Sequence, residues 1–138
     1  MKNIIATIIL LASFSLLSAQ DWRSSSAIQG TGNIIVLRAD TSTTGNIYVL
    51  GYFEGTIEPG TANEATSYFG RDYFLGKFDT DGLLQWIKHI ASPQHVFIYA
   101  GLAVDVNENI YVSGSFRDYV KISPTDSIFS SGLFDSFV

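Results

Sequence analysis

Apolar positions form one long block at the start of the chain and short runs afterwards. Residues 4–17 are an almost unbroken apolar stretch. Beyond it, runs rich in Ile, Val, Tyr and Phe alternate with clusters of Gly, Asn, Asp and Thr, and no segment keeps an apolar period of 3.6 residues. Short β-branched and aromatic runs bounded by turn residues are typical of strands. The pattern therefore predicts an apolar leader followed by an all-β chain.

The leader has the three parts of a secretory signal peptide. Lys2 supplies the positive start, residues 4–17 supply the apolar centre, and Ser18 and Ala19 are the small residues before a cleavage site. The alternative is a membrane anchor, but a spanning helix needs about 20 apolar residues. We therefore predict a signal peptide over residues 1–19, a secreted chain, and no transmembrane segment after cleavage.

The chain repeats itself at a constant offset in residue number, which we call the repeat offset. Asn-Ile-Tyr-Val at residues 46–49 returns at residues 109–112. The same offset joins four further pairs, which are Gly51 and Gly114, Phe53 and Phe116, Asp72 and Asp135, and Phe74 and Phe137. Trp22 precedes the first Asn-Ile-Tyr-Val segment by almost the same interval as Trp86 precedes the second. Residues 20–138 are therefore interpreted as the last strand of one unit, one full unit and part of the next.

Each unit is expected to hold four strands. The full unit has them at residues 34–38, 46–53, 72–78 and 83–90, and the next unit at residues 101–105, 109–116 and from 135 onward. Residues 79–82, Asp-Thr-Asp-Gly, predict a hairpin turn because Asp-Gly accepts the positive φ of tight hairpins. Residues 44–46 and 106–109 are similar turns between first and second strands.

The second strand of the unit is apolar on both faces, which predicts a position between two neighbouring sheets. Gly51 and Gly114 would allow another backbone to approach closely. Stacked sheets of four antiparallel strands with buried central strands are typical of a β-propeller, which closes with about four to eight blades. With units as long as the repeat offset, the chain supplies fewer than two. We therefore expect a partial propeller, an incomplete ring whose final blade the strand at Trp22 would complete.

Two motifs resemble the bacterial β-propeller repeat often called the SBBP repeat. They are G-N-I-Y-V-L-G-Y-F at residues 45–53 and D-Y-F-L-G-K-F-D-T-D-G-L-L-Q-W at residues 72–86. The second copy departs from the pattern, because Glu108 replaces the Gly before Asn109 and the segment after Phe116 lacks the Gly found at Gly55. The resemblance implies a secreted or cell-surface protein similar to those of Bacteroidetes. Such proteins are commonly large, and many end in a sorting domain for outer-membrane secretion.

Composition narrows the expected partners. Cys is absent, so stability has to come from packing and sheet hydrogen bonds, and no lipid can be attached to an N-terminal Cys. The net charge is −5, and it becomes −6 once Lys2 is removed with the leader. Scattered acids without clustered Lys and Arg argue against a nucleic-acid partner. The partner expected instead is an extracellular protein or a glycan.

A ligand is expected at the end of the sheets that carries the long connections, residues 54–71 and 91–100, because loops on a rigid scaffold usually carry function. The polar candidates there are Glu54, Glu58, Glu64, Arg71, His95, Arg117 and Asp118. Solvated loop charge is the simpler interpretation. A glycosidase would need two carboxylates at a defined separation, and nothing in the sequence fixes that separation.

No residue is assigned a catalytic, cofactor or metal role. His89 and His95 alone do not make a zinc site, which needs three or four ligands. Residues 79–82 lack the further oxygen ligands of a calcium loop. Trp86 could stack on a sugar, but its equivalence to Trp22 favours packing between sheets. Nucleophile and phosphate-loop motifs are absent from the sequence.

These features favour a secreted or cell-surface repeat protein that acts as a non-enzymatic binding or adhesion scaffold. The alternative is the N-terminal part of a secreted propeller enzyme, a polysaccharide lyase or hydrolase, whose catalytic residues lie outside this segment. A purely structural spacer at the cell surface is the third interpretation.

Overall fold

The computed structural model describes residues 25–68, 70–91, 98–121, 123 and 125–138. These residues form strands and turns, and none of them is helical. No described segment is a helix of the length and hydropathy that crossing a membrane requires. The predicted signal peptide, Trp22 and His95 lie outside the described residues. The all-β prediction is confirmed for the described residues.

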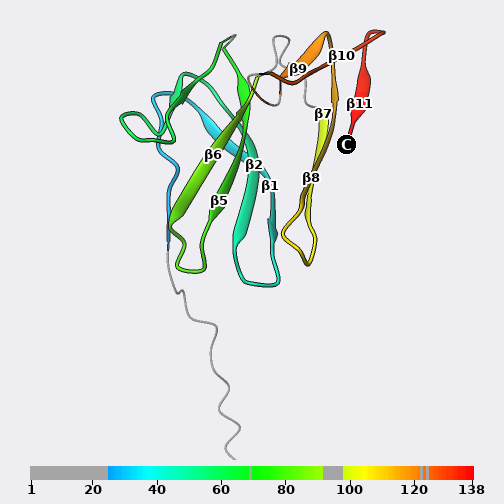
Figure 1. The fold of residues 1–138 in the computed structure, drawn as a ribbon. Coiled ribbons are helices and arrows are strands. Elements are labelled where there is room, and N and C mark those ends of the chain that lie inside the picture. The colour runs from blue at the N-terminus through cyan, green and yellow to red at the C-terminus, as the bar shows by residue number, and fades with distance from the viewer. Residues whose placement is uncertain (1–24, 69, 92–97, 122, 124) are drawn as a thin grey trace, which may run out of the picture.

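The first sheet is an antiparallel meander of four strands. Its strands are β1 (Ile34–Thr41), β2 (Ile47–Phe53), β5 (Asp72–Phe78) and β6 (Leu84–Ile90). They lie in the order β1-β2-β5-β6, so that each strand pairs with the next one of the set (Figure 1). All four predicted strands are present, and β1 continues beyond the predicted end at Arg38 as far as Thr41.

The second sheet contains β7 (Ile98–Val104), β8 (Ile110–Phe116) and β11 (Asp135–Phe137), in the order β11-β8-β7. Its register repeats that of the first sheet. Val104 pairs with Ile110 as Thr41 pairs with Ile47, and Phe137 pairs with Gly114 as Phe74 pairs with Gly51. The pairing therefore follows the repeat offset of the sequence. We call β1 to β6 the first unit and β7 to β11 the second unit.

Three short turns share one geometry. They span residues 42–46, 79–83 and 105–109, and in each the N–H of the fourth residue donates to the carbonyl of the first at 3.0 Å. The fourth residue has a positive φ in every case, 89° at Gly45, 80° at Gly82 and 62° at Glu108. A tight turn that ends in this left-handed conformation suits the twist of a hairpin. The predicted Asp-Gly turn is confirmed, and Glu108 adopts the conformation that Gly has in the other two turns.

The connection predicted as a long loop contains a small hairpin in both units. In the first unit β3 (Thr56–Ile57) pairs with β4 (Ala65–Thr66), and in the second β9 (Tyr119–Lys121) pairs with β10 (Ser127–Phe129). Thr56 faces Thr66 as Tyr119 faces Phe129, again at the repeat offset. Each hairpin follows a residue with positive φ, Gly55 at 76° and Asp118 at 63°. Asp118 thus replaces the Gly that the second copy lacks.

The main core lies between the two sheets. Leu50, Tyr73 and Leu75 of the first sheet belong to one buried cluster with Phe116 and Val120 of the second unit. A second cluster, on the other face of the first sheet, contains Val49, Phe53, Ile57, Phe74 and Phe78. Burial of each large apolar side chain contributes about 1.5–3 kcal/mol. Buried apolar residues therefore lie on both faces of β2. One face packs against the second sheet, so the predicted position between two neighbouring sheets is confirmed for that face and stays a prediction for the other.

At Gly51 the backbone of β1 and the ring of Phe74 leave no room for a side chain. A Cβ atom there would lie 2.2 Å from the carbonyl oxygen of Ile35 and 2.8 Å from the ring of Phe74. The partner strand β1 has a bulge between Val36 and Arg38, next to the pair that Val36 makes with Gly51. The close backbone approach predicted at this Gly is confirmed.

The sheets are joined at their first strands. The carboxylate of Asp40 in β1 accepts a hydrogen bond of 2.8 Å from the N–H of Val104 in β7. Figure 1 shows β7, β8 and β11 standing beside the first sheet, with the three short turns at one end of the molecule. The described residues form antiparallel sheets but no closed ring, so the propeller remains a prediction.

Candidate functional site

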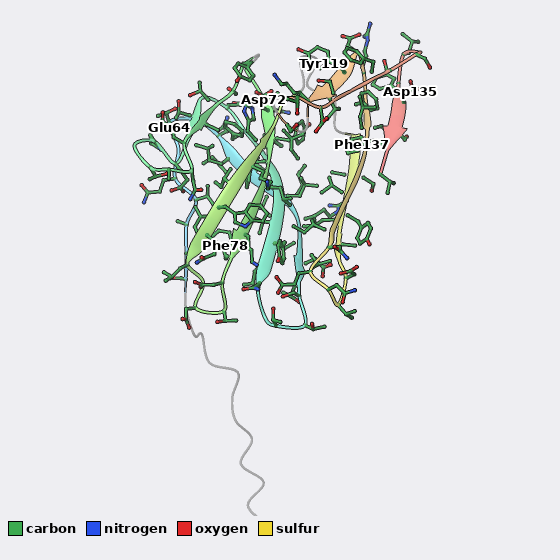
Figure 2. All side chains as sticks on the ribbon, viewed as in Figure 1. Glu64, Asp72, Phe78, Tyr119, Asp135 and Phe137 are labelled. Carbon is green, nitrogen blue, oxygen red and sulfur yellow. The ribbon has the colours of Figure 1, made fainter. Side chains whose placement is uncertain are left out.

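The hairpins β3-β4 and β9-β10 lie at the end of the sheets opposite the three short turns (Figure 1). We call this end the long-loop end, and it is where a ligand is expected from the sequence. Figure 2 labels Glu64, Asp72, Tyr119 and Asp135 at this end and Phe78 toward the other. The polar candidates of the first unit gather here, and their hydrogen bonds show what each one does.

Asp72 is completely buried and closes the loop that precedes β5. Its Oδ2 accepts a hydrogen bond of 2.9 Å from the N–H of Tyr68 and lies 2.8 Å from Nε2 of His89. The Tyr68 ring stacks on the His89 ring with centroids 5.3 Å apart. In the second unit Asp135 accepts 2.6 Å from the N–H of Ser131, which is the equivalent of Tyr68 at the repeat offset. The repeat of this bond assigns the carboxylate a structural role.

Glu54 and Arg71 form an ion pair across the base of the first hairpin. Nη2 of Arg71 lies 3.0 Å from Oε1 of Glu54, and Nδ2 of Asn33 donates to Oε2 at 2.8 Å. The guanidinium also lies 4.1 Å above the ring of Tyr52. The hydrogen bond to Glu54 is the main cause of a raised pKa at Arg71. Both charged groups of the pair therefore have partners within the first unit.

The remaining acids of the first hairpin also hold backbone. Oε1 of Glu58 accepts 2.7 Å from the N–H of Gln29, and Oε2 of Glu64 accepts 2.6 Å from the N–H of Gly60. No group of three or more metal-ligating side chains is found among the described residues. Glu54, Glu58 and Glu64, which the sequence offered as candidates, each accept a hydrogen bond within the first unit and hold its loop in place.

In the second hairpin the candidates Arg117 and Asp118 lie exposed at its start. Asp118 is tied to Ser130 through backbone, because its N–H donates to the Ser130 Oγ at 3.1 Å and its carbonyl accepts from the Ser130 N–H at 2.8 Å. Gly55 and Ser67 make the same two bonds, 3.0 and 2.8 Å long, in the first unit. The two hairpins therefore share one backbone closure.

The second hairpin and the segment between β10 and β11 carry exposed apolar side chains that sequence reasoning missed. They are Ile128, Phe129, Leu133 and Phe134, which we call the apolar loop patch. Phe129 is 73% and Leu133 72% exposed, and the Phe129 ring lies 5.8 Å from that of Tyr119. The equivalent residues of the first unit are Ala65, Thr66, Gly70 and Arg71. Comparing the units at the repeat offset would have revealed this replacement of small and polar residues by large apolar ones.

Packing of another sheet on the second unit need not cover this patch. The first unit already has a sheet packed on it, the second sheet, and its equivalents of Phe129 and Leu133 are still exposed, at Thr66 and Gly70. By the same geometry, a further sheet packed on the second would leave Phe129 and Leu133 exposed. Exposed apolar patches of this kind often mark interaction sites.

At the opposite end, Glu108 connects the two units. Its carboxylate accepts hydrogen bonds from Thr44 Oγ1, from Asn46 Nδ2 at 2.8 Å and from Tyr48 OH at 3.0 Å, and it pairs with Lys77 Nζ at 3.0 Å. The hydrogen bonds from Thr44 and Lys77 hold the pKa of Glu108 far below its usual range. The residue that departs from the repeat pattern is therefore a link between the turn of the second sheet and the first sheet.

The other residues singled out from the sequence have packing or turn roles. Asp79 Oδ1 accepts from the N–H groups of Asp81 and Leu83, as a hairpin turn requires. Trp86 packs on the core between the sheets, with its ring 6.2 Å from that of Tyr48. These contacts agree with the turn and packing interpretations of the two segments.

No family model, no curated protein and no solved structure matches the chain.

Proposed function

We propose that this chain is part of a secreted β-propeller repeat protein, resembling the SBBP type, that acts as a non-enzymatic binding or adhesion scaffold. The ligand is an extracellular protein or a glycan, bound at the long-loop end. The repeated antiparallel sheets, packed face to face with their first strands adjacent, support the propeller arrangement. The leader and the repeat motifs support export and the resemblance.

The observation that carries the binding role is the apolar loop patch. Its exposed aromatic and aliphatic side chains lie on either side of Ser130, which closes the hairpin by its hydrogen bonds to Asp118. Aromatic side chains with one free face are common at protein interfaces. In the same region of the first unit, each acid is held by a local partner. An enzyme that cleaves polysaccharides needs free paired carboxylates, and the described acids of the long-loop end give that alternative no support.

The proposal is tested by removing the patch without touching the fold. Phe129→Ser and Leu133→Ser are compared with Val106→Ser, because Val106 is 73% exposed, like Phe129, but lies in a short turn at the other end. The purified secreted protein is titrated onto intact producing cells and onto their isolated surface polysaccharide. We expect about tenfold weaker binding for the two patch variants, a size typical of hot-spot residues, and unchanged binding for Val106→Ser.

Treatment of the cells separates the two ligand classes. Loss of binding after protease treatment indicates a protein ligand, and loss after periodate oxidation indicates a glycan. Equal binding by all three variants would contradict a site at the apolar loop patch. Release of oligosaccharides from the polysaccharide during the titration would instead favour the enzyme.

A further inference from the structure

One aromatic side chain at the long-loop end of the first unit is exposed although the loop closure does not require it. Tyr68 is 70% exposed, while its backbone N–H donates to the buried carboxylate of Asp72. This bond uses only the backbone of Tyr68, and in the second unit the N–H of Ser131 makes the same bond to Asp135. The closure therefore explains Asp72 but does not explain an aromatic ring at Tyr68.

The Tyr68 ring is held in place from one side. It stacks on the imidazole of His89, with the ring centroids 5.3 Å apart and the ring planes at 29°. His89 is itself fixed, because its Nε2 lies 2.8 Å from Asp72 Oδ2 and its ring packs on that of Phe53 with centroids 5.5 Å apart. A ring covered on one face and still 70% exposed presents its other face to solvent. This flat surface is positioned before a ligand arrives, which lowers the entropy cost of binding.

A neighbouring sheet on this side of the first unit would leave the ring accessible. His89 lies on the side of the first sheet that carries Phe53, since their rings are in contact. In the second unit the corresponding side, which carries Phe116, packs against the first sheet, and Ser131 at the position of Tyr68 is still exposed. The same geometry keeps the Tyr68 ring open to a ligand in a longer repeat protein.

The surroundings of the ring are polar, which favours a sugar over a protein as the ligand. The hairpin before it has exposed side chains at Thr61, Glu64 and Thr66, and the Thr66 hydroxyl lies 3.0 Å from that of Thr56. No other large apolar side chain is exposed among the described residues of this connection, 54–68 and 70–71. Protein interfaces depend on clusters of large side chains, as in the apolar loop patch. A pyranose has one face of C–H groups and a rim of hydroxyls, which matches a single aromatic face among polar groups.

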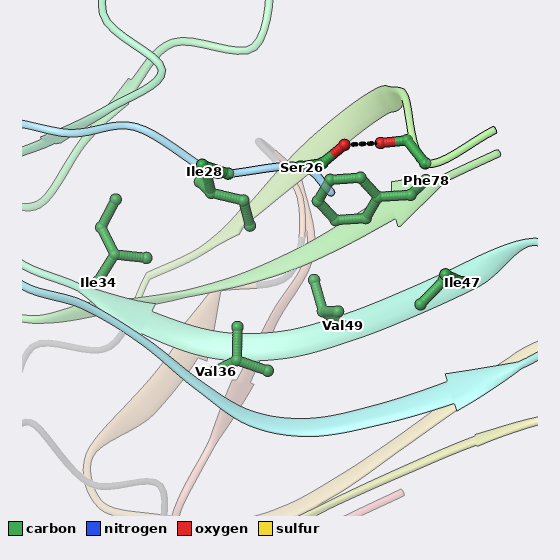
Figure 3. A pocket seen from close by; sticks show the side chains of 9 residues that line it. Ser26, Ile28, Ile34, Val36, Ile47, Val49 and Phe78 are labelled. Carbon is green, nitrogen blue, oxygen red and sulfur yellow. Dashed lines mark hydrogen bonds between the residues drawn. The ribbon is translucent and has the colours of Figure 1, made fainter. Parts of the chain in front are cut away.

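A larger hollow in the first unit is a poorer place for a sugar. It is a groove of about 430 Å³ whose lining is largely aliphatic and aromatic, with Ile34, Val36, Ile47, Val49 and Phe78. Figure 3 shows these side chains pointing into the groove, with the segment at Ile28 running across it. The Ser26 hydroxyl at its edge already donates to the carbonyl of Gly82. Sugar hydroxyls would lose their water in this groove and find few partners, which is unfavourable.

We propose that the Tyr68 ring, stacked on His89, is a binding site for a pyranose ring of an extracellular glycan. The C–H face of the sugar packs on the exposed face of Tyr68, and the sugar hydroxyls stay in contact with water and with the polar hairpin. The site is separate from the apolar loop patch. It rests on the proposed function in placing a glycan ligand at the long-loop end.

Two variants of Tyr68 test the site in the complete secreted product of the gene. Tyr68→Leu keeps an apolar side chain but removes the flat face, whereas Tyr68→Trp keeps a flat face. Both keep the backbone bond to Asp72, so their thermal unfolding midpoints should stay close to that of the wild type. The probe is the immobilised surface polysaccharide of the producing cells. We expect about tenfold weaker binding for Tyr68→Leu, as for a hot-spot tyrosine, and wild-type binding for Tyr68→Trp and Val106→Ser.

The outcomes separate this site from the apolar loop patch. Equal binding by Tyr68→Leu and the wild type overturns the inference, as does a wild type that does not bind the polysaccharide. An equal loss for Tyr68→Leu and Tyr68→Trp also overturns it, because a stacking site accepts an indole ring. Loss for Phe129→Ser alone keeps the proposed function and overturns the Tyr68 site. Loss for Tyr68→Leu alone supports the Tyr68 site and contradicts binding at the apolar loop patch.

Discussion

The two units have the same backbone at positions where their side chains differ. Gly45 and Glu108 end equivalent turns with φ of 89° and 62°, and Gly55 and Asp118 begin equivalent hairpins with φ of 76° and 63°. Left-handed backbone is uncommon for residues other than Gly and needs compensation from the surroundings. Glu108 receives it from hydrogen bonds to the first sheet, and Asp118 lies in the closure with Ser130. The hairpin geometry therefore imposes the conformation, and Gly is only one way to satisfy it.

The units differ most in side chains outside the shared turns, both in the loops and on the faces of the sheets. The Glu54–Arg71 ion pair of the first unit corresponds to Arg117 and Phe134 in the second, which cannot form an ion pair. Leu50, in the core between the sheets, corresponds to Ser113. Register and turns are therefore kept in both units, whereas the side chains in the loops and on the faces of the sheets differ.

The largest effect is expected for Gly51→Ala, at a position where both units have Gly. The new methyl group would lie 2.2 Å from a backbone oxygen, and backbone cannot move aside as a flexible side chain can. Overpacking of this kind destabilises by about 3 kcal/mol. Urea unfolding measures it, with Gly132→Ala as the control, since nothing lies within 4 Å of a Cβ there. Equal midpoints for both variants would contradict the close approach.

A smaller loss of stability is expected for Asp72→Ala. The equivalent variant Asp135→Ala shows how the two units differ in this respect. Asp72 is fully buried, so its removal leaves the N–H of Tyr68 without this acceptor, at a cost of about 2 kcal/mol. Asp135 is only half-buried, so Asp135→Ala should lower the free energy of unfolding by about 0.5 kcal/mol. Thermal unfolding of the two variants measures the difference. Equal losses would show that the shared loop bond, and not burial, decides the stability.

The link at Glu108 predicts a pH dependence that the turn at Gly45 cannot have. The folded pKa of Glu108 lies below its ordinary value of 4.5, so its carboxylate stabilises the fold above about pH 4.5, and this contribution is lost as the pH falls through that value toward the folded pKa. We expect the difference in unfolding midpoint between the wild type and Glu108→Gln to be larger at pH 7 than at pH 3. A difference independent of pH would contradict the link.

The smallest effect is expected for the Glu54–Arg71 pair, which the second unit lacks. Both side chains are about one-third exposed, and exposed ion pairs contribute about 0.5 kcal/mol. A double-mutant cycle with Glu54→Gln and Arg71→Gln measures the coupling free energy. A coupling well above about 1 kcal/mol would show that the first unit depends on charge at a position where the second does not.

The main strands could be predicted because the residue types, the repeat offset and the turn residues all indicate the same strand positions. The hairpins β3-β4 and β9-β10 could not be, because strands of two or three residues have no readable period. They depend on closures such as the bonds between Gly55 and Ser67, which join residues far apart along the loop. The acids of the long-loop end were recognised by type alone. Their partners are largely backbone N–H groups, which no spacing of side chains reveals.

The role of Glu108 in linking the units could not be predicted from the sequence either, because its partners, from Thr44 to Lys77, all belong to the first unit. The sequence marked the position only as a departure from the repeat. The packed sheets show the physical reason, because a carboxylate at this position reaches hydrogen-bond partners in the first unit. The exposed side chains of the apolar loop patch could have been suspected by comparing the units residue by residue.

The constant register of the repeat has a genetic consequence. Because equivalent strands and turns recur at the repeat offset, an in-frame gain or loss of one repeat length within this region joins positions that already fit one another. Unequal crossing-over between copies would then change the number of sheets without requiring a new kind of contact. Point substitutions such as those at Glu108 and Phe129 can afterwards give each copy its own neighbours and its own surface.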